Sequence, residues 1–348
     1  MKIENDIKLD FNDVLFRPKR SELSSRSEVD LERTYTFKHS KRTWSGIPLI
    51  TSNMDTVSSV DMFKKMSKHH CITCFHKYID INQIIQACTD GFDPKYFMLS
   101  TGITDTDFDR IKEQVSTLQN NNVGVHFICI DVANGYMFKL IEFCKKMRSE
   151  FPNITLVAGN VVSREITEEL IINGGIDIVK VGIGSGAVCT TRLQTGVGMP
   201  QFSAVMECAD AAHGLGGAII SDGGICVPGD VAKAYGGGAD FVMAGSMFAG
   251  HDECPGEVVE EEGVKYKLFY GMSSDTAMNK YHGGVASYRS SEGKTVKVKL
   301  KGSVDDTVNN ILGGVRSTCT YIGASRLKDI HKCATFLRVN RQVNTFYK

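Results

Sequence analysis

The 348-residue chain lacks the features that mark membrane proteins and nucleic-acid-binding proteins. No stretch approaches about 18 consecutive apolar residues, so the sequence predicts no membrane-spanning helix and no membrane partner. Its 40 basic and 40 acidic residues cancel, so no global field favours nucleic acid or an anionic lipid surface. No low-complexity tract or internal repeat appears beyond an alternation of strands and helices. With 42% hydrophobic and 23% charged residues, the composition is that of a soluble globular protein with a sizeable core.

The first residues contain no apolar core of the kind that a signal peptide requires. Eleven cysteines without secretory features are typical of reduced thiols, and we expect a cytoplasmic protein. Cys71 and Cys74 have the spacing of a redox or zinc pair, but no second pair accompanies them. Their apolar surroundings favour a buried strand instead.

Short β-branched runs recur along the chain, and each ends in a polar or glycine-rich turn. Eight runs are predicted to be strands, at residues 48–50, 72–75, 97–99, 127–130, 155–157, 178–181, 218–220 and 241–243. Helical periodicity lies between them, most clearly at 108–118, 137–148, 165–172 and 202–212. Strands that alternate with helices indicate a parallel sheet, and eight such units predict an α/β fold, the closed (β/α)8 TIM barrel.

The stretch from about residue 250 to 300 breaks this alternation. The acidic run 260–262 suits a solvated hairpin, whereas the denser Gly, Ser, Arg and Glu segments that follow favour an insertion covering an active site. We therefore expect a single barrel domain over residues 1–348, with a flap after the eighth strand and no regulatory insertion domain.

The loop after the sixth predicted strand is the most informative segment, because barrels place their chemistry on such loops. It holds glycines at 182, 184 and 186 and then delivers Cys189, Thr191 and Arg192. Glycines at this density let the backbone approach a ligand closely. Most free cysteines are buried and inert, but a cysteine at the end of a polar glycine-rich loop is a candidate nucleophile. The G-x-G-x-x-A pattern here follows the sixth strand, whereas a dinucleotide fingerprint opens the first helix, so we expect no Rossmann fold.

Glycine turns also end the seventh and eighth predicted strands, at residues 223–224 and 245–246. Barrels bind phosphate groups on the backbone N–H donors of such turns, although either turn alone is also explained as a tight connection. Asp222 ends the seventh strand, where a carboxylate suits a ribose diol. Lys77 and Asp131 end two other strands, and their position is equally compatible with structural ion pairs.

Taken together, these segments resemble the IMP dehydrogenase/GMP reductase family over essentially the whole chain. The resemblance lies in motifs at 9–18, 53–57, 131–136, 158–161, 188–192 and 220–224. Segments 270–274, 291–294 and 316–321 are similar to the reductase branch. The Arg-Tyr pair of the dehydrogenase flap is not recognisable, and no insertion the size of a small domain follows the second strand. Ser185 and Ala187 stand where the family pattern has proline and serine, which bears on the stiffness of the cysteine loop.

The resemblance implies NADPH-dependent reductive deamination of GMP to IMP and ammonia. It implies that Cys189 adds to C2 of the purine and that Thr191 and Glu292 protonate the departing amine. The implied nucleotide-binding residues are Asp222, Gly223, Gly224, Gly245, Ser246, Gly271, Met272, Ser273, Arg289, Ser290 and Gly293. The implied cofactor-binding residues are Lys77, Asp131, Val132, Ala133, Ile183, Gly184 and Tyr288, with Ser25, Arg26, Ser317, Thr318, Cys319 and Thr320 serving a neighbouring subunit's cofactor.

The resemblance also implies a homotetramer, and a K⁺ ion on the carbonyl groups of Gly184, Gly186 and Cys189, beside Arg192. The Arg26 guanidinium would suit the 2′-phosphate of NADPH, although a solvated surface arginine has the same sequence signature. Two alternatives stay open at this point. One is an IMP dehydrogenase-type enzyme that oxidises IMP with NAD through the same cysteine. The other is a purine-nucleotide-binding barrel without turnover, which would need neither a nucleophile nor an acid pair.

Overall fold

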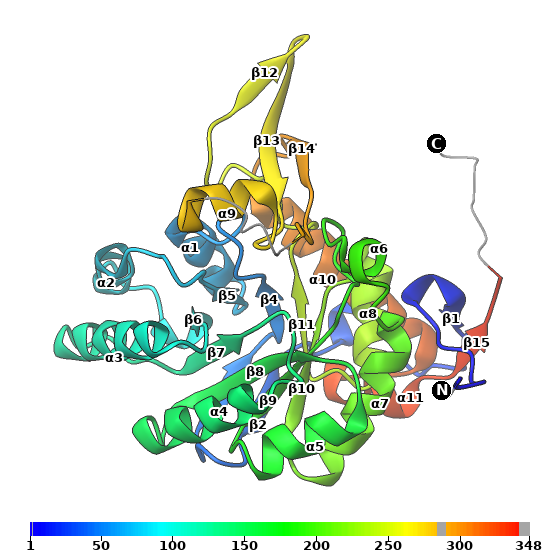
Figure 1. Ribbon diagram of the computed structural model, residues 1–348. Helices are drawn as coiled ribbons and strands as arrows, with labels where there is room; N and C mark the ends of the chain where they lie inside the picture. Colours follow the sequence, from blue (N-terminus) through cyan, green and yellow to red (C-terminus); the bar gives the residue numbers. More distant parts are fainter. Residues whose placement is uncertain (2, 284–289, 341–348) are drawn as a thin grey trace.

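The computed structural model describes residues 1, 3–283 and 290–340, and its centre is a closed parallel barrel (Figure 1). Eight strands follow one another around it in chain order, and β11 pairs back with β4. They are β4 (Leu49–Thr51), β5 (Ile72–Cys74), β6 (Phe97–Thr101), β7 (Phe127–Asp131), β8 (Thr155–Val161), β9 (Ile178–Val181), β10 (Ala218–Asp222) and β11 (Phe241–Ala244). The (β/α)8 barrel and all eight predicted strands are confirmed, with β6 and β8 running further than predicted.

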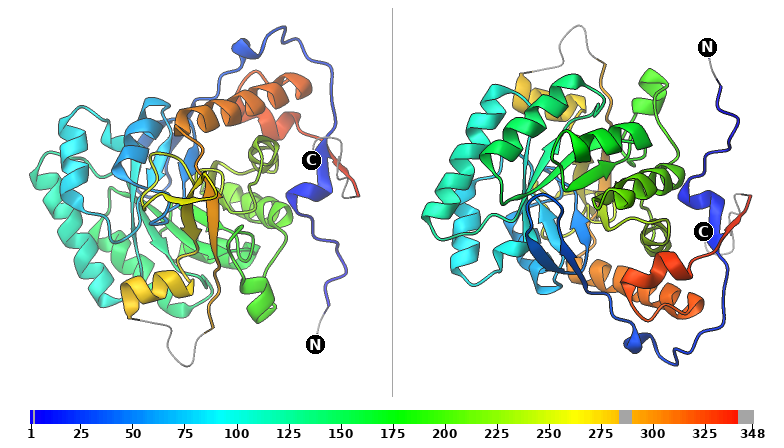
Figure 2. Two further views of the ribbon diagram at one scale, coloured as in Figure 1. Left: turned by 90° about the horizontal axis from the view of Figure 1, so that it is seen from above. Right: turned by 90° about the horizontal axis from the view of Figure 1, so that it is seen from below.

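Helices surround the barrel on its outside (Figure 2). The four predicted helices are confirmed as α3 (Asp105–Asn120), α4 (Phe138–Glu150), α5 (Arg164–Ile172) and α7 (Gln201–Gly214). The others are α1 (Val60–Lys68), α2 (Ile81–Thr89), the short α6 (Thr191–Thr195), α8 (Pro228–Gly236), α10 (Val304–Ile322) and α11 (Ile330–Cys333). Short polar side chains begin several of them, as where the hydroxyl group of Ser59 accepts the N–H of Met62 at the start of α1.

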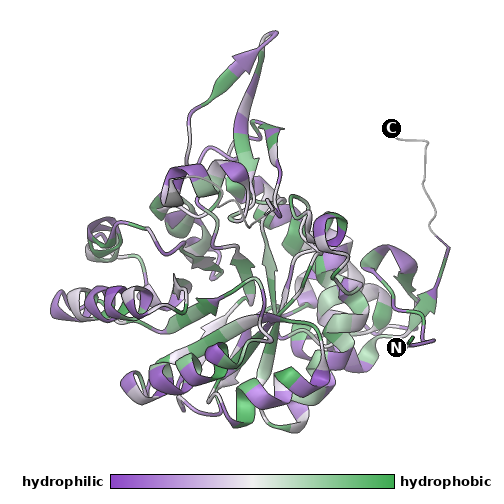
Figure 3. Cartoon of the chain, viewed as in Figure 1, coloured by the Kyte–Doolittle hydropathy of each residue, from purple (hydrophilic) through white to green (hydrophobic). Residues whose placement is uncertain are grey.

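The barrel strands are mostly hydrophobic, whereas the surrounding helices carry many hydrophilic residues (Figure 3). The barrel strands are buried on both faces and therefore read as nearly continuous apolar runs. Cys71 and Cys74 are fully buried, as their apolar surroundings predicted, and all eleven cysteines carry free thiols. Within the described residues, no helix has both the length and the apolar character needed to cross a bilayer.

A hairpin of β2 (Arg33–Thr36) and β3 (Thr43–Gly46) crosses the amino-terminal end of the barrel (Figure 2). Its Trp44 is almost fully buried and packs against Phe127 and Phe241, the first residues of β7 and β11. Near the chain ends, β1 (Val14–Phe16) pairs with β15 (Phe336–Arg338). The short turns are η1 (Phe11–Asp13), η2 (Arg26–Glu28), η3 (Pro94–Tyr96) and η4 (Leu327–Asp329).

Between β11 and α10 the chain forms a separate layer above the carboxyl ends of the barrel strands (Figure 1). It consists of an antiparallel sheet of β12 (Val259–Glu261), β13 (Val264–Tyr270) and β14 (Thr295–Lys299), with helix α9 (Asp275–His282). The predicted hairpin at the acidic run is confirmed, because β12 is exposed and turns into β13 at Glu262 and Gly263, which both have positive φ.

Candidate active site

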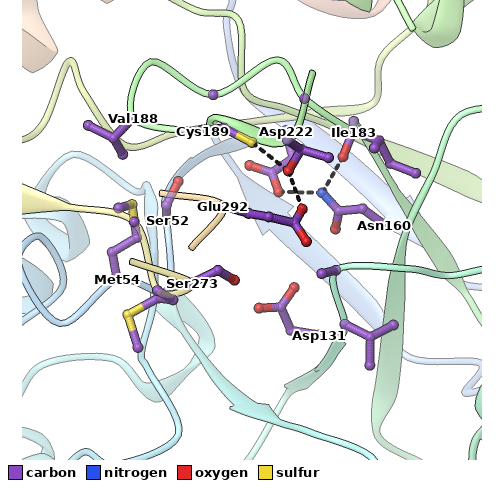
Figure 4. Close-up of a pocket in the computed structure, with 18 of the residues that line it drawn as sticks. Ser52, Met54, Asp131, Asn160, Ile183, Val188, Cys189, Asp222, Ser273 and Glu292 are labelled. Atoms are coloured by element: carbon purple, nitrogen blue, oxygen red, sulfur yellow. Dashed lines mark hydrogen bonds between the residues drawn. The ribbon is translucent and has the colours of Figure 1, made fainter. Parts of the chain in front are cut away.

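A cavity of about 250 Å³ opens at the carboxyl ends of the barrel strands (Figure 4). Loops that follow β4, β7, β8, β9 and β10 supply most of its walls, and residues 271–273 and 292 close it from above. The cavity therefore lies where a (β/α)8 barrel carries its chemistry.

Cys189 stands at the edge of this cavity on the loop that follows β9. Its thiol lies 3.2 Å from the hydroxyl oxygen of Thr191, which in turn donates a hydrogen bond of 2.7 Å to the Glu292 carboxylate. Gly182 permits the close approach of this loop to β10, because a Cβ atom there would lie 2.1 Å from the carbonyl oxygen of Asp222. The Ser185 hydroxyl also donates to that carbonyl at 3.1 Å, so a serine anchors the loop where the family pattern has proline.

Backbone hydrogen bonds hold Glu292 beside Cys189 even though the two lie on different layers. The N–H of Thr190 donates to the carbonyl of Glu292 at 2.9 Å, and the N–H of Glu292 donates to the carbonyl of Ser273 at 3.2 Å. Gly293 also forms isolated β-bridges with Cys189 and Ser274. The segment around Glu292 is thus fixed between the cysteine loop and the turn after β13. A thiol, a hydroxyl group and a carboxylate are thereby joined by two successive hydrogen bonds.

A buried lysine joins two carboxylates at the floor of the cavity. Lys180 lies on β9, is 2% exposed, and places its Nζ 2.9 Å from Asp131 and 2.7 Å from Asp222. Burial disfavours the ammonium, but the two carboxylates outweigh this effect and hold the pKa of Lys180 well above its ordinary value. Burial also acts to raise the pKa of Asp131, yet the Lys180 ammonium and a hydrogen bond from Asn53 lower it overall. Lys180 and Asp131 are therefore both charged at neutral pH.

A second cavity, of about 260 Å³, adjoins the first and shares Asn53, Asp131, Ala133, Met272 and Ser273 with it. Lys77 lines it and pairs with Asp107 on α3 at 3.3 Å. The rings of Tyr78 and Tyr281 stack at its rim, with centroids 4.1 Å apart and planes 7° from parallel. Burial lowers the pKa of His76, also in its lining, so this ring is neutral at pH 7.

Asp55, in the loop after β4, fastens the upper layer to the barrel. One of its carboxylate oxygens accepts hydrogen bonds from Tyr270 at 2.9 Å, Lys280 at 2.9 Å and Tyr281 at 2.6 Å. Asp55 is only 4% exposed, and burial alone would raise its pKa; the three donors reverse this effect and lower it. The end of β13 and helix α9 are thus held directly above the barrel.

The structure brings most of the predicted site residues together. Those that line the first cavity are Cys189, Thr191, Glu292, Asp222, Gly271, Met272, Ser273, Asp131, Val132, Ala133, Ile183, Gly184 and Gly186, and Lys77 lines the second. Gly223, Gly224, Gly245, Ser246, Ser290 and Gly293 belong to adjoining loops outside the lining. The two glycine turns do meet, because the Ser246 hydroxyl donates to the carbonyl of Ile225 at 3.3 Å. Tyr288 and Arg289 lie outside the described residues.

The predicted residues at the neighbouring-subunit position gather at a different place. Ser25 and Arg26 are exposed on and beside η2, which packs against α10, the helix that carries Ser317, Thr318, Cys319 and Thr320. None of these six residues lines either cavity. The side chain of Cys319 is fully buried in the core, and its place at the cofactor of a neighbouring subunit stays a prediction. The other three residues on α10 are partly exposed.

Two of the residues predicted to form the K⁺ site make hydrogen bonds within the protein. The Gly186 carbonyl accepts the N–H of Cys189 at 3.0 Å. The Arg192 guanidinium donates to the carbonyl of Met199 at 2.7 Å and lies 3.4 Å from Asp10. The cation site stays a prediction.

Two residues of the site were not singled out from the sequence. Lys180 sits within an otherwise apolar strand, and a charge in a buried strand requires a counter-charge, so its position was the available signal. Asn160 donates to Asp222 at 2.9 Å and to the Gly182 carbonyl at 2.7 Å, and only its place near the carboxyl end of β8 pointed to the site. Both are floor residues that orient other groups.

Comparison with known proteins agrees with this geometry. The family described as "IMP dehydrogenase / GMP reductase domain" matches residues 8–344. A protein named GMP reductase from Enterobacter sp. (strain 638) is 56% identical over 349 residues, covering 100% of this chain and 99% of that protein. GMP reductase 1 of Mus musculus is also 56% identical over 349 residues, covering 99% of both chains. The chain belongs to the IMP dehydrogenase/GMP reductase family.

Proposed function

We propose that the protein catalyses the NADPH-dependent reductive deamination of GMP to IMP and ammonia. The observation that carries this proposal is the alignment of the Cys189 thiol, the Thr191 hydroxyl and the Glu292 carboxylate at one wall of the cavity. The names of the full-length relatives support the reductase over the dehydrogenase. A binding module would have no use for this arrangement, which suits nucleophilic attack coupled to proton transfer.

In this mechanism the Cys189 sulfur forms a bond to C2 of the guanine base. The exocyclic amine must then leave as ammonia, and this requires a proton on nitrogen. As the sulfur attacks, the thiol proton of Cys189 would pass through the Thr191 hydroxyl to the Glu292 carboxylate, and the same pair would return it to the amine nitrogen, since the hydroxyl group lies between the sulfur and the carboxyl group. When bound, NADPH supplies the hydride that reduces C2. Cys189 departs from C2 as a thiolate, which completes IMP.

Asp222 would hold the ribose of the nucleotide. Both hydrogen bonds described for its side chain, from Lys180 and Asn160, go to Oδ2. Its Oδ1 can therefore accept a ribose hydroxyl group. The glycine turns after β10 and β11 would bind the phosphate through backbone N–H groups, and residues 271–273 would line the base.

The second cavity suits the nicotinamide half of the cofactor, because its lining combines the Lys77 ammonium, the Asp131 carboxylate and the hydroxyl groups of Ser100 and Thr101 beside stacked tyrosine rings. Arg26 with Ser317, Thr318 and Thr320 forms an exposed polar patch away from both cavities, where the far end of a neighbouring subunit's cofactor would bind. This arrangement is the reason for proposing a homotetramer. The layer from β12 to β14 would act as the flap of a single catalytic domain, in a cytoplasmic enzyme that uses K⁺.

Absorbance at the reduced-nicotinamide band tests the proposal. Purified protein with GMP and NADPH should consume NADPH, and the same protein with IMP and NAD⁺ should form no XMP. Net formation of XMP would establish the dehydrogenase alternative. Tight binding of GMP without any change in absorbance would establish the non-catalytic one.

A further inference from the structure

We propose that Lys180 is a positioning residue that holds the nucleotide-side acceptor Asp222 and the cofactor-side acceptor Asp131 in one ion-paired unit. The inference rests on the proposed function, because it takes the ribose of GMP as the ligand of Asp222. It goes beyond that function by assigning the placement of both ligand-binding carboxylates to a lysine side chain that is almost fully buried at the base of the first cavity.

The geometry of the floor carries this inference. Lys180 comes from β9, and its ammonium bridges the end of β7 to the end of β10, at 2.9 Å from Asp131 and 2.7 Å from Asp222. Its side chain is 3% exposed, whereas those of Asp131 and Asp222 are 34% and 17% exposed. The lysine is therefore hidden beneath the floor, and the carboxylates that it holds face the cavity.

Each carboxylate has one further amide support. Asn53 donates to Asp131 Oδ2 at 2.9 Å, and Asn160 donates to Asp222 Oδ2 at 2.9 Å. The Asn53 and Asn160 amides orient the carboxylates but carry no charge. The positive charge that both carboxylates share is the Lys180 ammonium. Lys77 acts on Asp131 from a greater distance, and the buried thiols of Cys74 and Cys129 lie near Lys180 on β5 and β7.

Removal of the ammonium would leave two carboxylates facing one small cavity. Two like charges that share one small cavity cannot both remain ionised without a cost in free energy, so one of the two carboxylates would take up a proton or turn away. Either response changes the hydrogen bonds that the nucleotide ribose and the cofactor meet. A single substitution should thus weaken the recognition of two different ligands.

Lys267 provides a matched control, because it is also buried and its ammonium, like that of Lys180, has close polar partners. Its ammonium donates to the carbonyl groups of His251, Asp252 and Cys254, at 3.0, 3.0 and 2.6 Å. These partners are backbone groups and none of them lines either cavity. Loss of this lysine should reduce stability without changing how a ribose is recognised.

Binding calorimetry with GMP and 2′-deoxy-GMP, without cofactor, tests the inference independently of turnover. The Lys180→Met variant should lose about 10-fold or more in GMP affinity but much less in 2′-deoxy-GMP affinity. The ratio of the two affinities, which measures the preference for the ribose, should therefore fall toward one. Its affinity for NADP⁺, measured separately, should also fall. Lys267→Met should keep the wild-type preference and NADP⁺ affinity, and Lys180→Arg, which retains the charge, should keep most of both.

An unchanged preference for GMP over 2′-deoxy-GMP in Lys180→Met would overturn the inference, as would a loss confined to one ligand. Should Lys180→Met fail to fold, the double variant K180M/D131N removes one carboxylate together with the ammonium. The ribose preference must collapse in that variant as well, because Asp222 has lost its cation. A wild-type protein that prefers GMP but never oxidises NADPH would defeat the proposed function and leave this inference standing. Normal turnover of GMP by the wild type, together with an unchanged ribose preference in Lys180→Met, would support the proposed function and overturn this inference.

Discussion

Thr191 donates a hydrogen bond of 2.7 Å to Glu292, although 101 positions separate the two residues in the chain. Thr191 opens a short helix beside the nucleophile, and Glu292 belongs to the layer that covers the barrel. The candidate acid therefore reaches the thiol only when that layer is in place. Proton transfer at the site and the position of the covering layer are consequently linked through the Thr191–Glu292 hydrogen bond.

This contact leads to a prediction for Glu292→Gln. The amide cannot supply the proton that departing ammonia needs, so deamination of GMP should slow by about 10²–10⁴-fold, the range for a lost general acid. Hydride exchange between IMP and NADP⁺ loses no ammonia and should be spared much more. Stopped-flow absorbance in both directions gives the two rates. Equal impairment of both would mean that Glu292 only positions the nucleotide or the flap.

The nucleophile is tested by Cys189→Ala. Turnover should fall by several orders of magnitude, whereas GMP binding should persist, because the proposed ribose and phosphate contacts lie elsewhere. Cys88→Ala is a suitable control: this thiol lies on α2, outside both cavities, and burial raises its pKa to about 11, so it stays protonated. A Cys189→Ala enzyme that kept a tenth of the wild-type rate would rule out covalent catalysis at this position.

Cofactor choice is tested at Arg26, which is exposed beside α10. Arg26→Ala should raise the Michaelis constant for NADPH more than that for GMP, since a guanidinium pairs well with a 2′-phosphate. Arg164→Ala, at an exposed arginine that pairs with Asp210 on the barrel's outer surface, serves as the control. Wild-type protein that uses NADH and NADPH equally well at low concentration would contradict the proposed preference.

Asp55 makes the attachment of the upper layer sensitive to acid. Its pKa is lowered in the folded protein, so its contribution to stability is complete above the unfolded value of about 4 and is lost as the pH falls through the folded value. Asp55→Asn should therefore lower the melting temperature at neutral pH and flatten its decline between about pH 6 and pH 3.

Exposed Asp61, 3.7 Å from Lys64, provides the control, and Asp61→Asn should leave the melting curve nearly unchanged. Wild-type and Asp55→Asn proteins with parallel melting temperatures across that pH range would show that Asp55 does not hold the layer.

The barrel could be predicted because its signal is local. Runs such as that of β9 are apolar, end in a glycine turn, and need no distant partner to be recognised. The pairing of β1 with β15 joins Val14 to Arg338, and no local periodicity reports such a contact. The hairpin under the barrel was likewise missed, because Trp44 acquires its role only from packing against Phe127 and Phe241.

The candidate site divides in the same way. Cys189 and Thr191 are neighbours in sequence and stood out in a glycine-rich loop, whereas Glu292 came only from family resemblance. Lys180 looked like one residue of a strand until its two carboxylate partners from other strands were placed beside it. The burial of the Cys319 side chain was likewise not predicted, because its position on α10 does not reveal which face of the helix packs against the core.

The central claim is that Cys189, with Thr191 and Glu292, reduces and deaminates GMP at C2. The most direct measurement uses NADPH that carries deuterium at the transferable position, with mass spectrometry of the product nucleotide and an assay for ammonia. The account predicts IMP that carries deuterium at C2, with one ammonia released for each NADPH consumed. Unlabelled IMP, or XMP as the product, would contradict it.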